Sequence, residues 1–209
     1  SVLLGRLADV DKTSQCCGKK SLDFYWRSCV DGQHVAAAVT ASLAALQANG
    51  GRLNPIQEAD AASRVKRRIN RARQGKLRSP AHVKTIRSAP ELVDMFELRW
   101  GHEDDRDDDL IVSRYDALGH LLTPAHRALL RLYYVEQPDS GAWFLGLHAH
   151  EKTLVMAGER GRSGVDQEAT DEQQQLHIDR AIAILDAGAH DHCGVPELSQ
   201  RFGDTPLAS

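Results

Sequence analysis

The sequence predicts an α+β protein in which a small sheet carries the candidate functional residues and helices before and after it pack against the sheet. Three segments rich in aromatic and branched residues predict strands of this sheet, at residues 92–100, 130–136 and 142–152. Amphipathic stretches predict two helices before them, at residues 33–48 and 54–74, and one after them, at residues 171–187. A first strand is predicted at residues 21–29.

The two early helices carry clear start and stop signals. The run Asn49-Gly50-Gly51 ends the first helix. Asn54 is the N-cap of the second, Pro55 occupies its first position, and Gln57 closes a capping box. The predicted apolar stripes are Val35, Val39, Ser42, Leu43 and Leu46 in the first helix and Ala62, Val65, Ile69 and Ala72 in the second.

The remaining segments predict connections and extensions. Residues 1–20 are expected to be a weakly ordered extension, residues 21–187 the domain, and residues 188–209 a tail. Residues 77–90 form a basic connection, and residues 101–129 a long insertion between two central strands. Within that insertion, residues 110–120 predict a strand or short helix. Thr123 as a cap before Pro124 predicts a short helix.

The charge of the chain is unevenly distributed. At 42% hydrophobic the 209 residues can bury a core, and a net charge of −3 excludes a generic polyanion binder. Residues 61–90 nevertheless hold ten Lys or Arg and no acidic residue, whereas residues 103–109 hold six acidic residues around Arg106. This segregation predicts a basic surface with an acidic loop nearby.

The cysteines and the hydropathy exclude several classes of protein. Cys16, Cys17, Cys29 and Cys193 are too few and too irregularly spaced for a disulfide framework or a zinc ribbon. No apolar run approaches the roughly 20 residues that cross a bilayer, and no signal-peptide core opens the chain. We therefore expect a soluble cytoplasmic protein without a membrane partner.

Cations and imidazoles gather at or near the ends of the central strands. They are Arg99, Arg131, His148, His150 and Lys152. Adjacent strands would bring these groups together on one face of the sheet. Strand alternation predicts that both histidines and Lys152 share a side, with Leu145 and Leu147 on the other.

These side chains suit RNA cleavage by the substrate's own 2′-hydroxyl. That reaction needs a base for the 2′ proton, cations for the charge on the phosphoryl oxygens, and an acid for the leaving 5′ oxygen. Arginine binds phosphate in a bidentate manner, and histidine titrates near neutral pH. The alternative is that Arg99 and Lys152 are solvated strand ends. Tyr134 could stack on a base, or it and Tyr133 could belong to the core.

The second helix offers a candidate nucleic-acid surface. Arg64, Arg67, Arg68 and Arg71 lie together on one predicted face, and no acidic residue follows Asp60 within the helix. Such a face could track phosphates. The alternative is an ordinary solvated helix face.

A metal site is a weaker alternative. His148 and His150 could bind zinc with His190, His192 and Cys193 of the tail. The tail carries little structural signal and the His-x-His pattern is common, so we expect neither a metal nor a cofactor.

Several segments resemble the RelE/ParE toxin superfamily, and in particular its HigB-like, phage-derived branch. They are FELR at residues 96–99, LRLYY at 130–134, FLGLHAHEKT at 144–153 and QLHIDRA at 175–181. The resemblance implies the order β-α-α-β-β-β-α, a mainly antiparallel sheet with two N-terminal helices packed on it, and a C-terminal helix. It also implies metal-independent endoribonuclease activity on mRNA, commonly on the ribosome, and a cognate antitoxin partner.

The resemblance also assigns residues. Arg99 and Arg131 match basic sheet positions of the family, Lys152 matches the basic residue after the last central strand, and His148 and His150 flank that site. The chain departs from the family in its long insertion. Two other functions stay open: a ParE-like gyrase poison without catalysis, and a nucleic-acid-binding regulator. The acidic run at residues 103–109 could cover the basic site or bind an antitoxin.

Overall fold

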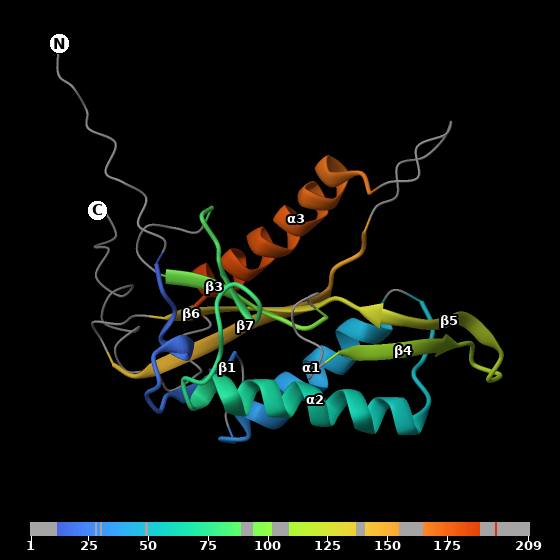
Figure 1. Cartoon of the computed structure of the whole chain (residues 1–209), viewed down its shortest axis with the longest axis horizontal. Coiled ribbons are helices and arrows are strands. Elements are labelled where there is room, and N and C mark those ends of the chain that lie inside the picture. The colour runs from blue at the N-terminus through green and yellow to red at the C-terminus, as the bar shows by residue number, and fades with distance from the viewer. Residues whose placement is uncertain are drawn as a thin grey trace, which may run out of the picture.

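The computed structural model describes residues 12–27, 29, 31–48, 50–88, 94–101, 109–136, 141–154, 165–188 and 195. Within them a five-stranded sheet lies between two helices on one face and a third helix on the other (Figure 1). A separate two-stranded hairpin extends from this body. The predicted α+β class with a mainly antiparallel sheet is confirmed.

The central sheet has the order β1-β7-β6-β3-β2. Its strands are β1 (Asp23–Trp26), β2 (Val83–Thr85), β3 (Asp94–Arg99), β6 (Leu130–Glu136) and β7 (Trp143–Glu151). β1 pairs with β7 in parallel, and the other pairs are antiparallel. The three predicted central strands are therefore adjacent, as expected. The edge strand β2 was not predicted, because three residues within a basic connection show no alternation.

Each face of the sheet is covered by helices. α1 (His34–Gln47) and α2 (Pro55–Arg73) share one apolar cluster with β1, β3, β6 and β7, whereas α3 (Gln167–Asp186) closes a second cluster on the opposite face. The side chain of Asn54 accepts a hydrogen bond from the Gln57 amide (2.9 Å), which confirms the predicted cap. α3 begins earlier than predicted because Asp166 caps it through the Ala169 amide.

Aromatic side chains fill the α1/α2 side of the sheet. Tyr134 is fully buried, stacks on Phe96 and meets the ring of Phe144 edge-on. Its hydroxyl lies 2.8 Å from Oγ of Ser14, in the segment predicted to be weakly ordered. That segment includes a short 3₁₀ helix, η1 (Gln15–Cys17), with Cys16 buried. Packing against these buried rings stabilises the N-terminal segment in an ordered conformation, which its composition alone did not predict.

A β-bulge shifts the pairing of β6 with β7. Tyr133 is opposite His148, but Tyr134 is opposite Gly146, so Leu147 is an additional residue. Leu147 consequently packs in the α3-side cluster, and His148 contacts α3 from the same face. The predicted separation of the leucines from the histidines is therefore wrong, since a bulge interrupts the strict alternation on which it depended.

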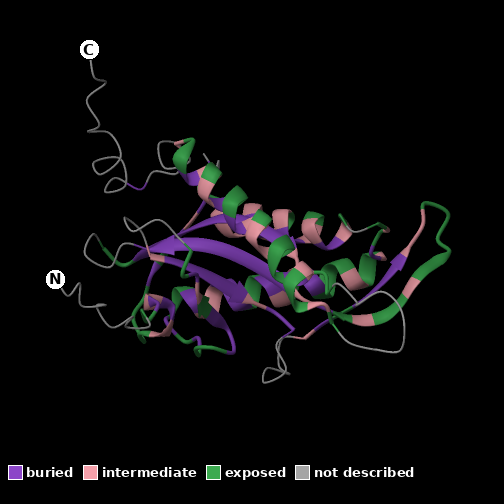
Figure 2. Cartoon of the chain, turned by 90° about the horizontal axis from the view of Figure 1, so that it is seen from above, coloured by how far each residue is buried: buried purple, intermediate pink, exposed green. Residues whose placement is uncertain are grey.

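The long insertion forms a hairpin of β4 (Leu110–Tyr115) and β5 (Leu121–Ala128). The side chain of Asp116 accepts hydrogen bonds from the amides of Leu118 and His120 and so fixes the turn. The helix predicted from Thr123 is wrong, because pairing with β4 overrides the local cap signal. Figure 2 shows the exposed tip of this hairpin extending away from the buried central strands. An ion pair between Arg114 and Glu151 joins the hairpin to β7.

Replacing Gly146 with alanine should destabilise the sheet. A Cβ there would lie 2.6 Å from Cε3 of Trp26 and 3.2 Å from Cε2 of Phe24. Overpacking of this kind costs about 1–3 kcal/mol, measurable by urea denaturation. In a Trp26→Leu background the same substitution should cost less, because the smaller side chain leaves room for the methyl group. Equal costs in both backgrounds would contradict the steric explanation.

Candidate functional site

Cross-strand pairing brings four predicted site residues to the α3 side of the sheet. Arg99 of β3 is opposite Arg131 of β6, which is opposite His150 of β7. Two pairs further along, Tyr133 is opposite His148. Residues directly opposite each other project from the same face, so the expected convergence of Arg99, Arg131, His148 and His150 occurs.

These residues belong to one network of hydrogen bonds, ion pairs and stacked rings, here called the polar cluster. It consists of Glu97, Arg99, Arg131, Tyr133, His148, His150, Lys152, Gln174 and His177. Strands β3, β6 and β7 form its floor, and Gln174 and His177 of α3 cover it. Most of its members are buried, so the cluster lies within the interface between sheet and helix.

Glu97 is the hub of the cluster. Its Oε1 lies 3.1 Å from Nε of Arg131 and 3.4 Å from Nε of Arg99, while Oε2 accepts a hydrogen bond from Gln174 (2.8 Å). Arg131 is 3% exposed and also donates to the carbonyl groups of Trp100 and Leu130. Burial lowers the pKa of Arg131, and the charge of Glu97 opposes that shift. Arg131 therefore serves the structure of the site and does not face solvent.

The three histidines form a stack between β7 and α3. The rings of His150 and His177 are 3.8 Å apart, and Nε2 of His148 lies 3.0 Å from Nδ1 of His177. Nε2 of His150 lies 3.1 Å from the hydroxyl of Tyr133. Burial, with the repulsion of a protonated His177, lowers the pKa of His148 to about 4 and that of His150 to about 3. Both imidazoles are therefore neutral at pH 7 and able to accept a proton.

Lys152 marks the accessible end of the cluster. Its Nζ donates to Oε1 of Gln174 (2.8 Å), which links it to Glu97. Burial lowers the pKa of Lys152, and Glu97 opposes the shift. A pocket of about 210 Å³ opens beside it and is lined by His148, His150 and His177 among others. A cation, two proton acceptors and a small cavity thus adjoin one another, an arrangement that suits an anionic ligand.

Two predicted RNA contacts are unavailable to a ligand. Arg68 is fully buried, donates to the carbonyl group of Arg99 and lies over the ring of Trp100. Tyr134 is fully buried in the opposite cluster. The prediction that four arginines of α2 share a surface is therefore wrong for Arg68. Arg67 is exposed, and Arg64 and Arg71 are partly exposed.

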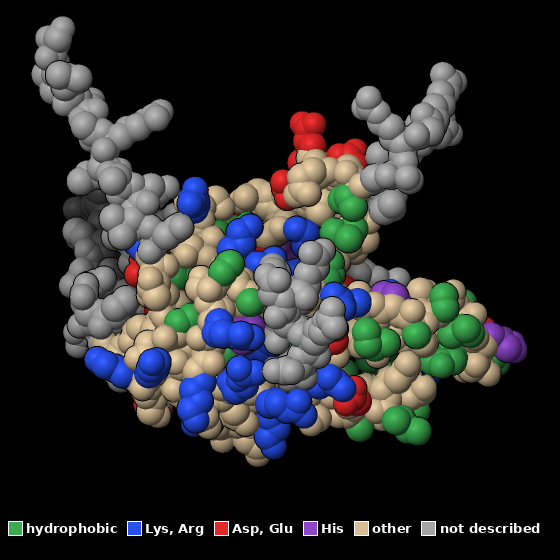
Figure 3. Space-filling view, in the orientation of Figure 1, with side chains coloured by type: hydrophobic (Ala, Val, Ile, Leu, Met, Phe, Trp, Pro, Cys, Tyr) green, Lys and Arg blue, Asp and Glu red, His purple; other side chains and the backbone are tan. Residues whose placement is uncertain are grey.

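Lysine and arginine side chains gather on the face of the molecule seen in Figure 3, over α2 and upward toward α3. The exposed cations of α2 and of the segment after it are Lys66, Arg67, Arg73, Lys76, Arg78, Lys84 and Arg87. The predicted basic surface is present.

Some members of the cluster were not singled out from the sequence. Glu97 lies two residues before Arg99, so alternation could have placed both on one face. Gln174 and His177 are three apart on α3, on the same stripe as Ile178 and Ala181, which pack on the sheet. That spacing was the available signal.

The predicted metal ligands of the tail and most of the acidic run cannot be placed in the fold. His190, His192, Cys193 and residues 102–108 lie outside the described residues. Asp109, at the end of the acidic run, pairs with Arg127 (2.9 Å). Among the described residues, no group of three or more His, Cys, Asp or Glu side chains is placed to hold a metal ion. None of the described helices has the length and apolar character that crossing a bilayer requires.

Comparison with known proteins adds no family to these observations. No protein-family model matches the chain, and no curated protein or solved structure matches it.

Proposed function

We propose that the chain is an endoribonuclease of the RelE/HigB type, the toxin of a toxin–antitoxin pair. The observation that supports this most strongly is the convergence of Arg99, Arg131, His148 and His150 on one face of three adjacent strands, with Lys152 at its open end. These residues are distant in sequence, and their side chains suit the chemistry of RNA cleavage.

In the proposed reaction, the 2′-hydroxyl oxygen of the substrate attacks the adjacent phosphorus atom and the bond to the 5′ oxygen breaks. A neutral imidazole, His148 or His150, takes the 2′ proton, since burial keeps both unprotonated at pH 7. Lys152 stabilises the phosphoryl oxygens and donates a proton to the leaving oxygen. Arg99 supplies a second cation, and Arg131 positions it through Glu97. The products are a 2′,3′-cyclic phosphate and a 5′-hydroxyl.

The fold class supports the proposed relationship. The α+β class and the mainly antiparallel sheet are compatible with that relationship. The chain departs from the order β-α-α-β-β-β-α in the strand β2 and in the β4–β5 hairpin, which we regard as additions. We further propose that the protein acts in the cytoplasm on mRNA, as a free enzyme or on the ribosome. A cognate antitoxin would silence it, and neither metal nor cofactor would be required.

A transcript-end map after brief induction of the protein tests this proposal. The wild type should create new 5′ ends within coding regions, and Lys152→Ala with Arg99→Ala should reduce them at least about 100-fold, because the transition-state charge loses its stabilisation. Lys20→Ala with Lys76→Ala is the matched control, since both lysines are exposed and outside the cluster. Growth arrest with intact transcripts would contradict the proposal and favour a ParE-like gyrase poison.

A nucleic-acid-binding regulator is the second candidate. The exposed cations of α2 and the following segment favour it. Replacing Arg67 and Lys66 with alanine should then weaken duplex binding. The slope of log K against log salt concentration should become shallower by roughly 0.9 per lost phosphate contact, as titrations at several salt concentrations would measure. Duplex affinity that is unchanged in this variant would exclude α2 as the binding surface.

A further inference from the structure

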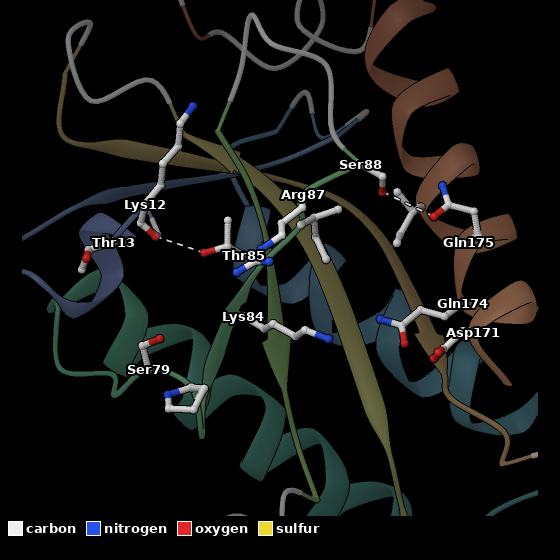
Figure 4. A pocket seen from close by; sticks show the side chains of 13 residues that line it. Lys12, Thr13, Ser79, Lys84, Thr85, Arg87, Ser88, Asp171, Gln174 and Gln175 are labelled. Atoms are coloured by element: carbon white, nitrogen blue, oxygen red, sulfur yellow. Dashed lines mark hydrogen bonds between the residues drawn. The ribbon is translucent and has the colours of Figure 1, made fainter. Parts of the chain in front are cut away.

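A second pocket lies beside the polar cluster, between the edge strand β2 and helix α3. Its volume is about 590 Å³, which is in the range of sites that hold one nucleotide-sized molecule. The lining comes from the N-terminal segment, from residues 79–88 and from the first half of α3. Figure 4 shows Lys84 pointing from β2 toward the α3 side chains Gln174 and Asp171.

The lining suits a phosphorylated ligand. Three cations contribute to it, Lys12, Lys84 and Arg87, against a single carboxylate, Asp171. Lys12 forms an ion pair with Asp94. We assign Lys84 and Arg87 to the ligand because both line the pocket and are exposed. Hydroxyl and amide groups that could bind a sugar or base line the remainder: Ser79, Thr85, Ser88, Gln174 and Gln175.

Two observations connect this pocket to the cluster. Gln174 lines both this pocket and the smaller one beside Lys152, and it bridges Lys152 and Glu97. Lys84 is directly opposite Glu97 in the sheet, and its charge contributes to lowering the pKa of Lys152. A chain of linked phosphates could therefore pass from one pocket to the other across Gln174.

We propose that this pocket binds a nucleotide of single-stranded RNA next to the phosphate held at Lys152. Lys84 and Arg87 bind its phosphate, and the hydroxyl and amide groups bind its sugar and base. The inference rests on the proposed endoribonuclease function for the identity of the ligand. None of the residues that line the pocket belongs to the proposed catalytic set of Arg99, Arg131, His148, His150 and Lys152.

Fluorescence anisotropy with a short, labelled 2′-O-methyl oligoribonucleotide of mixed sequence tests this inference, because the probe binds without being cleaved. Lys84→Ala with Arg87→Ala should weaken binding at least about tenfold, since charge-assisted hydrogen bonds to phosphate are lost. The slope of log K against log salt concentration should become shallower by about 0.7 for each lost phosphate contact. Lys20→Ala with Arg52→Ala is the control, because both residues are exposed and neither lines the pocket nor belongs to α2 or the segment after it.

A second variant separates binding from damage to the fold. Asp171→Asn removes the only carboxylate among the lining residues and should strengthen binding, which a damaged protein would not do. Inorganic phosphate, added at matched ionic strength against chloride, should displace the probe weakly. Complete displacement by phosphate would indicate a free-anion site and overturn the inference, as would unchanged affinity in the Lys84 and Arg87 variant.

The outcome for this pocket is distinguishable from that for catalysis. If the wild type cleaves no RNA but its oligonucleotide affinity depends on Lys84 and Arg87, the pocket is supported and the endoribonuclease proposal fails. If the wild type cleaves RNA and the variant of Lys84 and Arg87 binds and cleaves equally well, the pocket inference fails and the proposed function stands.

Discussion

Replacing Glu97 with alanine should lower the free energy of unfolding by about 3–5 kcal/mol, the usual cost of removing one partner of a buried ion pair. Glu97 is 1% exposed and Arg131 3% exposed, so the guanidinium would remain buried without its counter-charge. The substitution also removes the acceptor of Gln174, which holds α3 on the sheet. Urea denaturation followed by circular dichroism at pH 7 measures the loss.

Two further variants define the origin of that loss. Asp179→Ala removes an exposed carboxylate that hydrogen-bonds within α3, and it should change stability by no more than about 0.5 kcal/mol. The double variant Glu97→Leu with Arg131→Met should recover part of the loss, because no isolated charge remains. A double variant whose free energy of unfolding is lower than that of Glu97→Ala would show that the unpaired charge of Arg131 is not the cause of the loss.

The sequence predicted the elements that carry strong local signals. The Asn54–Pro55 cap and the two helix stripes are local in origin, and the central strands are rich in branched and aromatic residues, so these elements could be located. β5 could not, since the local signal at Thr123 and Pro124 favours a helix and only pairing with β4 makes it a strand. Tertiary pairing overrides local preference in such segments.

The site was predicted in outline for a related reason. Cross-strand register brings Arg99, Arg131 and His150 together, and the motifs along the chain were sufficient to suggest this. The burial of Arg131 and His150 was not predictable, because it depends on α3, whose placement over the cluster is a long-range contact. Arg68 illustrates the same limit: one arginine of a basic helix turned inward to a carbonyl group and the face of Trp100.

The histidine stack should make the fold sensitive to acid. The pKa values of His148 and His150 are lowered in the folded protein, from about 6.5 to about 4 and about 3. The unfolded chain therefore binds more protons than the folded one below about pH 6.5, and stability falls as the pH falls. Between about pH 7 and pH 5 each imidazole should remove about 2 kcal/mol from the free energy of unfolding.

The surroundings of the stack reinforce this dependence. Arg180 of α3 and Arg27 lower the pKa of His148, and Arg131 lowers that of His150, so a proton entering the stack meets only like charges among these neighbours. Glu136, on the other face of the sheet, acts in the opposite sense, because burial raises its pKa. A carboxyl group with a raised pKa favours the folded state at low pH and partly offsets the loss.

Urea denaturation at several pH values tests the acid sensitivity. In His148→Gln with His150→Gln, the fall in stability between about pH 7 and pH 5 should be smaller by several kcal/mol than in the wild type, whatever the cost of the substitutions at pH 7. Leu118→Gln, on the exposed hairpin turn, is the control and should leave the wild-type dependence unchanged. Parallel pH profiles for the wild type and the double variant would show that the stack does not control acid unfolding. A stability–pH profile that is steeper in the wild type would mean that protonation of His148 and His150 also separates α3 from the sheet. RNA cleavage should then be lost together with the fold as the pH falls.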